Sequence, residues 1–168
     1  MDSGRVVYMN GVFVPESEAK ISIFDSALMF GDMVFEMTRS FNKEQFKLRE
    51  HLERLYIGIK LLHIPIDMTI DEMEQACLET IAKNDKVFSE QDEHRLMINV
   101  SRGPLGLYSS VFDGRIEPTV VIADFPLKWT VAAMAPLFDT GINAVIPSQR
   151  AIPASLMEPK IKNRSRLF

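Results

Sequence analysis

The chain of 168 residues has the composition of a folded protein: 46% of its residues are apolar, 25% are charged, and the formal net charge is −4. Eleven Phe and ten Met provide bulky core side chains, which excludes general disorder. The negative charge gives no global reason to bind nucleic acid or an anionic membrane. No apolar run reaches the roughly 20 residues of a membrane helix, and the first residues lack the apolar stretch of a signal peptide, so we expect a cytoplasmic protein.

Two antiparallel hairpins are predicted, each from two short apolar runs: Val6–Met9 with Val12–Val14, and Val34–Phe41 with Gln45–Leu48. Asn10 and Gly11 join the first pair, and type I′ turns favour this dipeptide because both central residues take a positive φ. Between the hairpins, Asp25 and Ser26 can cap a short helix.

Two helices and three further strands follow. Residues at three- and four-residue spacings give Arg49–Leu62 one apolar stripe, which Pro65 ends. Thr69 and Glu72 form a predicted capping box that opens a second helix, which runs to about Asn84. The next strands are predicted at Arg95–Ser101 and Thr119–Asp124, and a last one at Gly141–Pro147.

Hairpins and strands outnumber helices, so the fold class is α+β, with a small two-layer N-terminal domain and a mostly antiparallel sheet. We expect this domain to span residues 1–126 and an interdomain connector to span 127–134.

Basic residues gather at the end of the chain: Lys160, Lys162, Arg164 and Arg166 fall within nine residues that hold no acid. Such a cluster is most often a solvated face. A nucleic-acid-binding tail is disfavoured, because only Phe168 is interleaved and the chain is acidic overall. A third interpretation is chemical, since a buried lysine with a neutral amine can add to a carbonyl group. Spacing alone does not choose among the three.

Four arginines fall in or beside the predicted elements: Arg39, Arg54, Arg95 and Arg102. Each either lays its alkyl stem along apolar surface or binds an anion, because the planar guanidinium matches the two oxygens of a carboxylate or phosphate. The single cysteine, Cys77, lies on the apolar side of the second helix and is interpreted as a core residue. The three histidines have no metal-ligand spacing, so no metal site is predicted.

Five segments stand in a characteristic order: Met9–Gly11 with Val14-Pro15, Asp25–Glu36, Phe46–Leu55, Ser101–Gly103 and Pro159–Arg164. Jointly they resemble the class IV, or fold-type IV, aminotransferases, and the branched-chain aminotransferases in particular. The resemblance covers essentially the whole chain. It implies pyridoxal 5′-phosphate as cofactor, an amino acid and a 2-oxo acid as substrates, and a homodimer with pockets near the subunit interface. It also implies that residues 135–168 begin a larger β-rich, pseudo-barrel domain that is cut short.

The resemblance also implies roles for single residues. Lys160 resembles the lysine that bonds covalently to the cofactor, because an asparagine often follows that lysine by three residues, here Asn163. If Lys162 had this role instead, Ser165 would stand where the asparagine is expected. Arg54, within the segment Glu-His-x-x-Arg-Leu, resembles the arginine that reaches the cofactor phosphate.

Four residues match positions that line the substrate pocket of branched-chain aminotransferases: Phe30, Phe35, Arg39 and Arg95. This match implies transamination of an apolar, branched-chain type L-amino acid. D-amino-acid aminotransferases carry an arginine and a histidine where this chain has Leu107 and Ser109, so that activity is disfavoured. Phe30 and Ser165 stand where related enzymes carry tyrosines, which leaves the exact substrate open.

Two alternatives remain. A 4-amino-4-deoxychorismate lyase has the same fold and uses the same lysine and cofactor for elimination. A non-catalytic domain that keeps the fold is also compatible, because the family's carboxylate opposite the pyridine nitrogen and its main phosphate-binding turns lie beyond Phe168. We therefore expect an incomplete enzyme that is inactive as these 168 residues alone.

Overall fold

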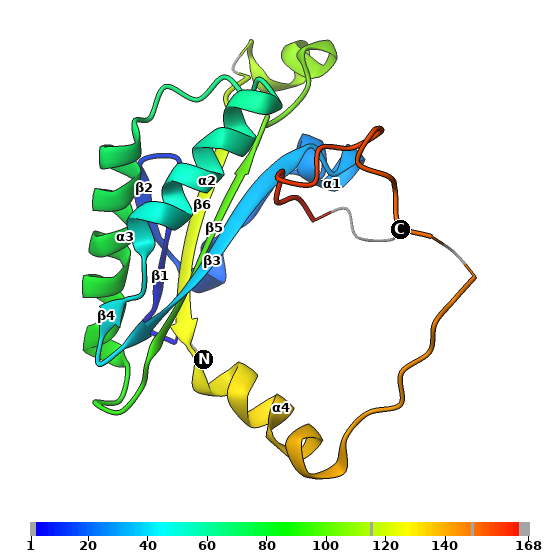
Figure 1. Cartoon of the computed structure of the whole chain (residues 1–168). Helices are drawn as coiled ribbons and strands as arrows, with labels where there is room; N and C mark the ends of the chain where they lie inside the picture. Colours follow the sequence, from blue (N-terminus) through cyan, green and yellow to red (C-terminus); the bar gives the residue numbers. More distant parts are fainter. Residues whose placement is uncertain (1–2, 115, 149, 165–168) are drawn as a thin grey trace.

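The computed structural model describes residues 3–114, 116–148 and 150–164, and its centre is one antiparallel sheet (Figure 1). The strand order is β2-β1-β6-β5-β3-β4. The strands are β1 (Val6–Met9), β2 (Val12–Pro15), β3 (Met33–Phe41), β4 (Glu44–Gln45), β5 (His94–Ser101) and β6 (Thr119–Pro126). Both predicted hairpins are confirmed, although β4 ends before Leu48, which instead begins a helix.

Two helices, α2 (Leu48–Leu61) and α3 (Ile70–Asn84), lie side by side over one face of this sheet (Figure 1). The other helical elements are α1 (Ser26–Phe30), α4 (Lys128–Thr140) and the short 3-10 turns η1 (Glu16–Glu18), η2 (Asp85–Val87) and η3 (Gly106–Phe112). The predicted caps are confirmed: Asp25 accepts from the Ala27 amide at the start of α1, and Thr69 and Glu72 form the capping box of α3.

The core lies between this helical layer and the sheet. Alternate residues of the central strands point into it, and they meet the apolar stripes of α2 and α3. Fully buried members include Leu52, Met73, Cys77, Leu96 and Ile98. Cys77 is therefore a core residue, as predicted.

Gly58 sets the distance between α2 and the sheet. A Cβ atom at this position would lie 2.9 Å from Cγ1 of Val34, closer than such atoms approach in proteins. The missing side chain lets α2 pack directly on β3. This close approach brings the polar residues of α2 within reach of β3.

The other face of the three central strands carries no helical layer in Figure 1. Its side chains form three cross-strand rows, Phe35–Asn99–Val121, Met37–Met97–Ala123 and Arg39–Arg95–Phe125. Since neighbouring residues of a strand point to opposite faces, these rows alternate with the buried core residues. The rows are mostly apolar; Phe35 and Val121 are buried, and the other side chains of the rows are half-buried.

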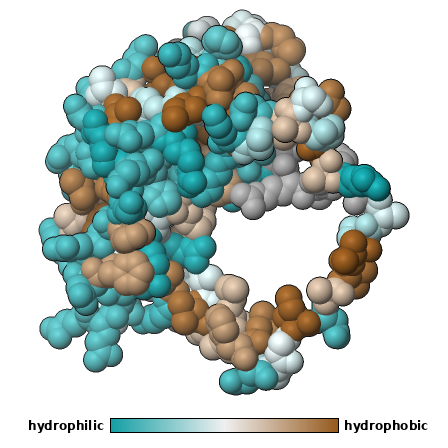
Figure 2. Space-filling view, viewed as in Figure 1, coloured by the Kyte–Doolittle hydropathy of each residue, from teal (hydrophilic) through white to brown (hydrophobic). Residues whose placement is uncertain are grey.

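Helix α4 and the segment after it stand off the body. Figure 2 shows brown, apolar surface along this arm. Four apolar residues of α4 and the following segment, Val131, Phe138, Val145 and Ile146, are 52–96% exposed. The strand predicted at Gly141–Pro147 is wrong for this structure: the segment has no strand geometry and is exposed. A strand needs a neighbour to satisfy its backbone hydrogen bonds, and the described residues offer none there. None of the described helices is long and apolar enough to cross a membrane.

Candidate functional site

The last described residues return to the edge of β3. The backbone amide of Phe35 donates to the Lys162 carbonyl at 3.0 Å, which fixes the segment along the strand. From there, Lys162 reaches Glu36 with its ammonium group, whereas Arg164 turns to the open face and donates to Oδ1 of Asn99 at 2.8 Å. The segment therefore crosses the sheet edge and contributes to both faces.

Glu36 is the centre of the polar cluster at this edge. It lies in the middle of β3, faces α2, and its side chain is fully buried. Arg54 binds it with two nitrogens, Nε at 2.5 Å and Nη2 at 2.8 Å. Nδ1 of His51 lies at 2.8 Å and Nζ of Lys162 at 3.0 Å, both from Oε2 of Glu36.

The spacing of α2 explains the pair from the helix. His51 and Arg54 are three residues apart, so they lie on one face of α2 and reach the same carboxylate. Burial by itself raises the pKa of Glu36, but the hydrogen bonds from Arg54, His51 and Lys162 outweigh it and lower this pKa to about 2. The carboxylate therefore stays ionised at neutral pH.

A groove of about 840 Å³ lies beside this cluster. It is lined from one side by α2 and from the other by the returning segment: Glu50, Glu53, Arg54, Ile57 and Pro159–Asn163. The Arg54 side chain is 49% exposed, and Glu36 takes only two of its nitrogens. Nη2 also lies 3.4 Å from Nδ1 of His51, whereas Nη1 makes no hydrogen bond to any described residue. A guanidinium N–H group in this position can bind an anion.

The two lysines of the groove differ in their surroundings. Lys160, the residue predicted to bond the cofactor, is exposed, and only its backbone amide makes a described hydrogen bond, to Glu158. The Lys162 side chain is 26% exposed, its ammonium pairs with Glu36, and its nitrogen lies 5.1 Å from the centre of the Phe35 ring. Ser165 stands three residues after Lys162, at the place where the family resemblance expects an asparagine, and it lies outside the described residues.

The predicted substrate residues are only partly brought together. Arg39 and Arg95 are cross-strand partners and line a cavity of about 220 Å³ with Met37 and His51. Both guanidinium groups already have contacts: Nε of Arg39 donates to the Ser40 carbonyl and its guanidinium lies 3.9 Å from the centre of the Phe41 ring, while Nε of Arg95 lies 2.9 Å from Sδ of Met37. Phe35 lies on the same open face, in contact with Lys162.

Phe30 lies apart from these residues, on α1, where 64% of it is exposed. Arg102, in contrast, has a structural role. It pairs with Asp32 at 2.6 Å and donates to the carbonyls of Leu62 and His63 at the end of α2. This arginine therefore ties α2 to the sheet.

Sequence reasoning missed two members of the site, Glu36 and His51. Glu36 is an acid in the middle of an apolar strand, and His51 stands one helical turn before Arg54. A buried acid needs cations or hydrogen-bond donors nearby. An acid within an apolar strand was therefore the signal in the sequence that could have indicated this cluster. What the sequence does not reveal is that the partner lysine comes from the far end of the chain.

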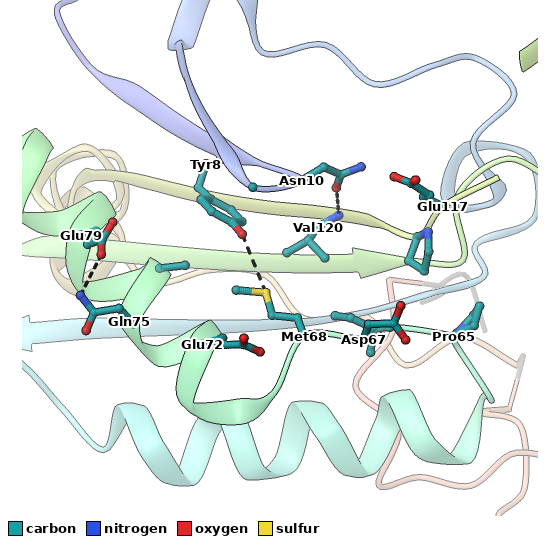
Figure 3. A pocket seen from close by; sticks show the side chains of 14 residues that line it. Tyr8, Asn10, Pro65, Asp67, Met68, Glu72, Gln75, Glu79, Glu117 and Val120 are labelled. Carbon is teal, nitrogen blue, oxygen red and sulfur yellow. Dashed lines mark hydrogen bonds between the residues drawn. The ribbon is translucent and has the colours of Figure 1, made fainter. Parts of the chain in front are cut away.

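A second groove, of about 660 Å³, lies on the α3 side of the helical layer, between β1 and α3 (Figure 3). Its polar groups are largely engaged: the Asn10 side chain accepts from the Val120 amide, and Gln75 donates to Glu79. The Tyr8 hydroxyl points to the sulfur of Met68, as Figure 3 shows. None of the predicted site residues lines this groove.

Comparisons with known proteins agree with the resemblance found in the sequence. The family model described as "Amino-transferase class IV" matches residues 33–168. A protein of Methanocaldococcus jannaschii, provisionally named a branched-chain-amino-acid aminotransferase, is 36% identical over 165 residues, which cover 96% of this chain and 52% of the relative.

Solved structures show the same architecture. The branched-chain amino acid aminotransferase of T.th., in complex with N-(5′-phosphopyridoxyl)-L-glutamate, superimposes with a TM-score of 0.72 at 27% identity, covering 95% of this chain and 50% of that one. The branched-chain aminotransferase of Thermoproteus uzoniensis with norvaline gives 0.70 at 26% identity, covering 95% and 51%. The chain thus spans about half the length of these relatives.

Proposed function

Because the chain belongs to the class IV aminotransferases, we propose that its protein is a pyridoxal-phosphate-dependent aminotransferase that moves an amino group between an apolar, branched-chain type L-amino acid and a 2-oxo acid. One observation carries the proposal: Arg54, from α2, lines the same groove as two lysines from the far end of the chain. The groove thereby combines an anion-binding guanidinium with an amine, the two groups that a phosphorylated aldehyde requires.

When bound, pyridoxal phosphate supplies an electron sink for the breaking bonds at the amino-acid Cα. The residues of this chain would hold and orient it. Arg54 would bind the phosphate through the N–H groups that Glu36 leaves free. A groove lysine would bond the cofactor and, when released from it, carry a proton to or from the substrate.

The choice between the two lysines is open to test. Family spacing favours Lys160, as the sequence comparison proposes. The contacts favour Lys162, because its backbone and its ammonium group are both held at β3, whereas the Lys160 side chain is exposed. Since a covalent bond forms fastest where the amine is already oriented, we favour Lys162; its ammonium group must first lose a proton and leave Glu36, because only the neutral amine adds to an aldehyde.

Substrate binding is proposed on the open face of the sheet. Phe35 would form an apolar wall, and Arg39 and Arg95 would bind a substrate carboxylate in the cavity between them. For Phe30, the proposal rests on the resemblance alone. An apolar amino acid is supported by the norvaline complex of the Thermoproteus uzoniensis enzyme.

The remaining expectations belong to the same proposal. Residues 1–126 would form the small domain, 127–134 the connector and 135–168 the start of a cofactor-binding domain. The exposed apolar residues of α4 and of the following segment support this division, because such surfaces usually mark an interface. A cytoplasmic homodimer is proposed from the resemblance.

The test is cofactor uptake by the protein expressed from its complete coding region. We expect visible absorbance with pyridoxal phosphate, and transfer of amino groups from branched-chain amino acids to a 2-oxo acid. No uptake by the wild type would refute the enzyme proposal. Uptake with pyruvate release from aminodeoxychorismate, and without transamination, would instead identify the lyase.

Borohydride reduction followed by peptide mapping tells the lysines apart, because it fixes the cofactor on the amine that bonded it. We expect the label on Lys162 and its loss in Lys162→Ala but not in Lys160→Ala. Lys86→Ala, an exposed lysine in η2, is the control. A label that disappears only in Lys160→Ala would assign the role to Lys160.

A further inference from the structure

Glu36 differs from an ordinary structural ion pair in the source of its partners. They come from two separate elements, α2 and the returning segment, and both lead into the groove. Here one buried carboxylate holds a guanidinium and an ammonium group that the proposed function assigns to the same cofactor.

The hydrogen bonds divide the two oxygens of Glu36. Oε1 accepts from Nε of Arg54, whereas Oε2 accepts from Nη2 of Arg54, from Lys162 and from the amide of Met37 at 3.3 Å, and it faces His51. Two basic side chains therefore share one carboxylate. The excess positive charge lies on the groove side, where an anion can balance it.

The position of the cations is thus set by Glu36. Bidentate binding fixes the plane of the guanidinium, so the free N–H groups of Arg54 point in one direction. The same carboxylate holds the end of Lys162, a long side chain that would otherwise populate many rotamers. Lys160 has no such contact among the described residues, although it lines the same groove.

From this geometry we propose that Glu36 is a positioning residue of the cofactor site, which orients Arg54 toward the phosphate and selects Lys162 over Lys160 as the amine that bonds the cofactor. The inference rests on the proposed function. It adds a residue that would touch neither the substrate nor the reacting atoms.

The test compares Glu36→Gln with the wild type, using the complete protein and pyridoxal phosphate itself. The lysine amine adds to the aldehyde with loss of water, and borohydride delivers a hydride to the carbon while water protonates the nitrogen. The product is a stable secondary amine that can be mapped. We expect Glu36→Gln to bind pyridoxal phosphate about tenfold or more weakly, since charge-assisted hydrogen bonds are lost. We also expect the label to spread from Lys162 to Lys160.

The ratio of label on the two lysines is a readout that a merely structural role would not change. Glu44→Gln, an exposed glutamate of the neighbouring strand β4, is the matched control and should keep the wild-type ratio. Glu36→Asp keeps the charge but shortens the side chain by one methylene, so the carboxylate lies farther from Arg54 and Lys162. It should give an intermediate affinity and ratio, and it replaces Glu36→Gln if that variant does not fold.

The outcomes separate the two proposals. A wild type that takes no label on either lysine refutes the proposed function. A wild type labelled on Lys162, together with folded Glu36 variants of unchanged affinity and ratio, overturns the role of Glu36 alone. A wild type labelled on Lys160 also overturns it, because the contact with Lys162 would then select nothing.

Discussion

Replacing Glu36 by Gln should lower the stability of the protein by an amount that depends on pH. Its pKa is about 2 in the folded protein, against an ordinary value of 4.5. A carboxyl whose pKa is lowered by folding contributes stability that is fully present above its unfolded pKa and is lost as the pH falls toward the folded one. At about 1.4 kcal/mol for each pKa unit, this contribution is about 3 kcal/mol at pH 7.

The same linkage predicts how the contribution of Glu36 to the free energy of unfolding varies with pH. The contribution should fall to less than half its neutral value near pH 3, because the unfolded chain is by then almost fully protonated at this position. A loss of about 3 kcal/mol also agrees with the usual effect of removing one partner from a buried ion pair. Part of the loss is offset by solvent, since Arg54 is half exposed.

Urea denaturation followed by circular dichroism, at several values from pH 7 to pH 3, measures the difference between wild type and variant. Glu44→Gln should remain within about 0.5 kcal/mol of the wild type throughout, as exposed substitutions do. The reasoning would be refuted by a Glu36→Gln difference that is constant with pH. A difference below about 0.5 kcal/mol at pH 7 would refute it equally.

Three further substitutions test the fold by the same denaturation measurement. Gly103→Ala should be severely destabilising, because the backbone there has a φ of +77° and the new Cβ would lie 1.9 Å from the Glu117 carbonyl oxygen; a stable variant would contradict this. Thr69→Ala removes the cap of α3 and should cost about 1 kcal/mol. Replacing His94 by Phe leaves the buried Asp124, whose pKa is raised by burial, without its hydrogen-bond partner, at a cost of about 3 kcal/mol. Burial by itself lowers the pKa of His94, but Asp124 and Asp85 outweigh burial and raise this pKa above its ordinary value of 6.5. The contribution of His94 to the free energy of unfolding is therefore fully present below about pH 6.5 and is lost as the pH rises. A loss of stability that does not change with pH would contradict this charge argument.

Local signals were sufficient for most elements of the small domain. The Asn10-Gly11 turn has positive φ at both positions, 45° and 93°, as its sequence requires. The capping box at Thr69 and the apolar stripe of α2 depend on residues three or four apart, so they can be recognised without knowledge of the fold. The strand predicted at Gly141–Pro147 is absent for a different reason: a strand depends on a neighbouring strand, and the local sequence does not show whether one is present.

The candidate site could be described only with both the local sequence and the tertiary structure. Sequence alone determined the fold class, the family resemblance and a short set of basic residues, because these depend on local periodicity and on motif spacing. It did not determine which lysine shares a carboxylate with Arg54, since Lys162 reaches Glu36, 126 residues earlier in the chain, only after β3 and α2 have packed together. Tertiary structure decided this through Glu36: a buried carboxylate must recruit cations from wherever the fold brings them, and here it recruits Arg54 and Lys162.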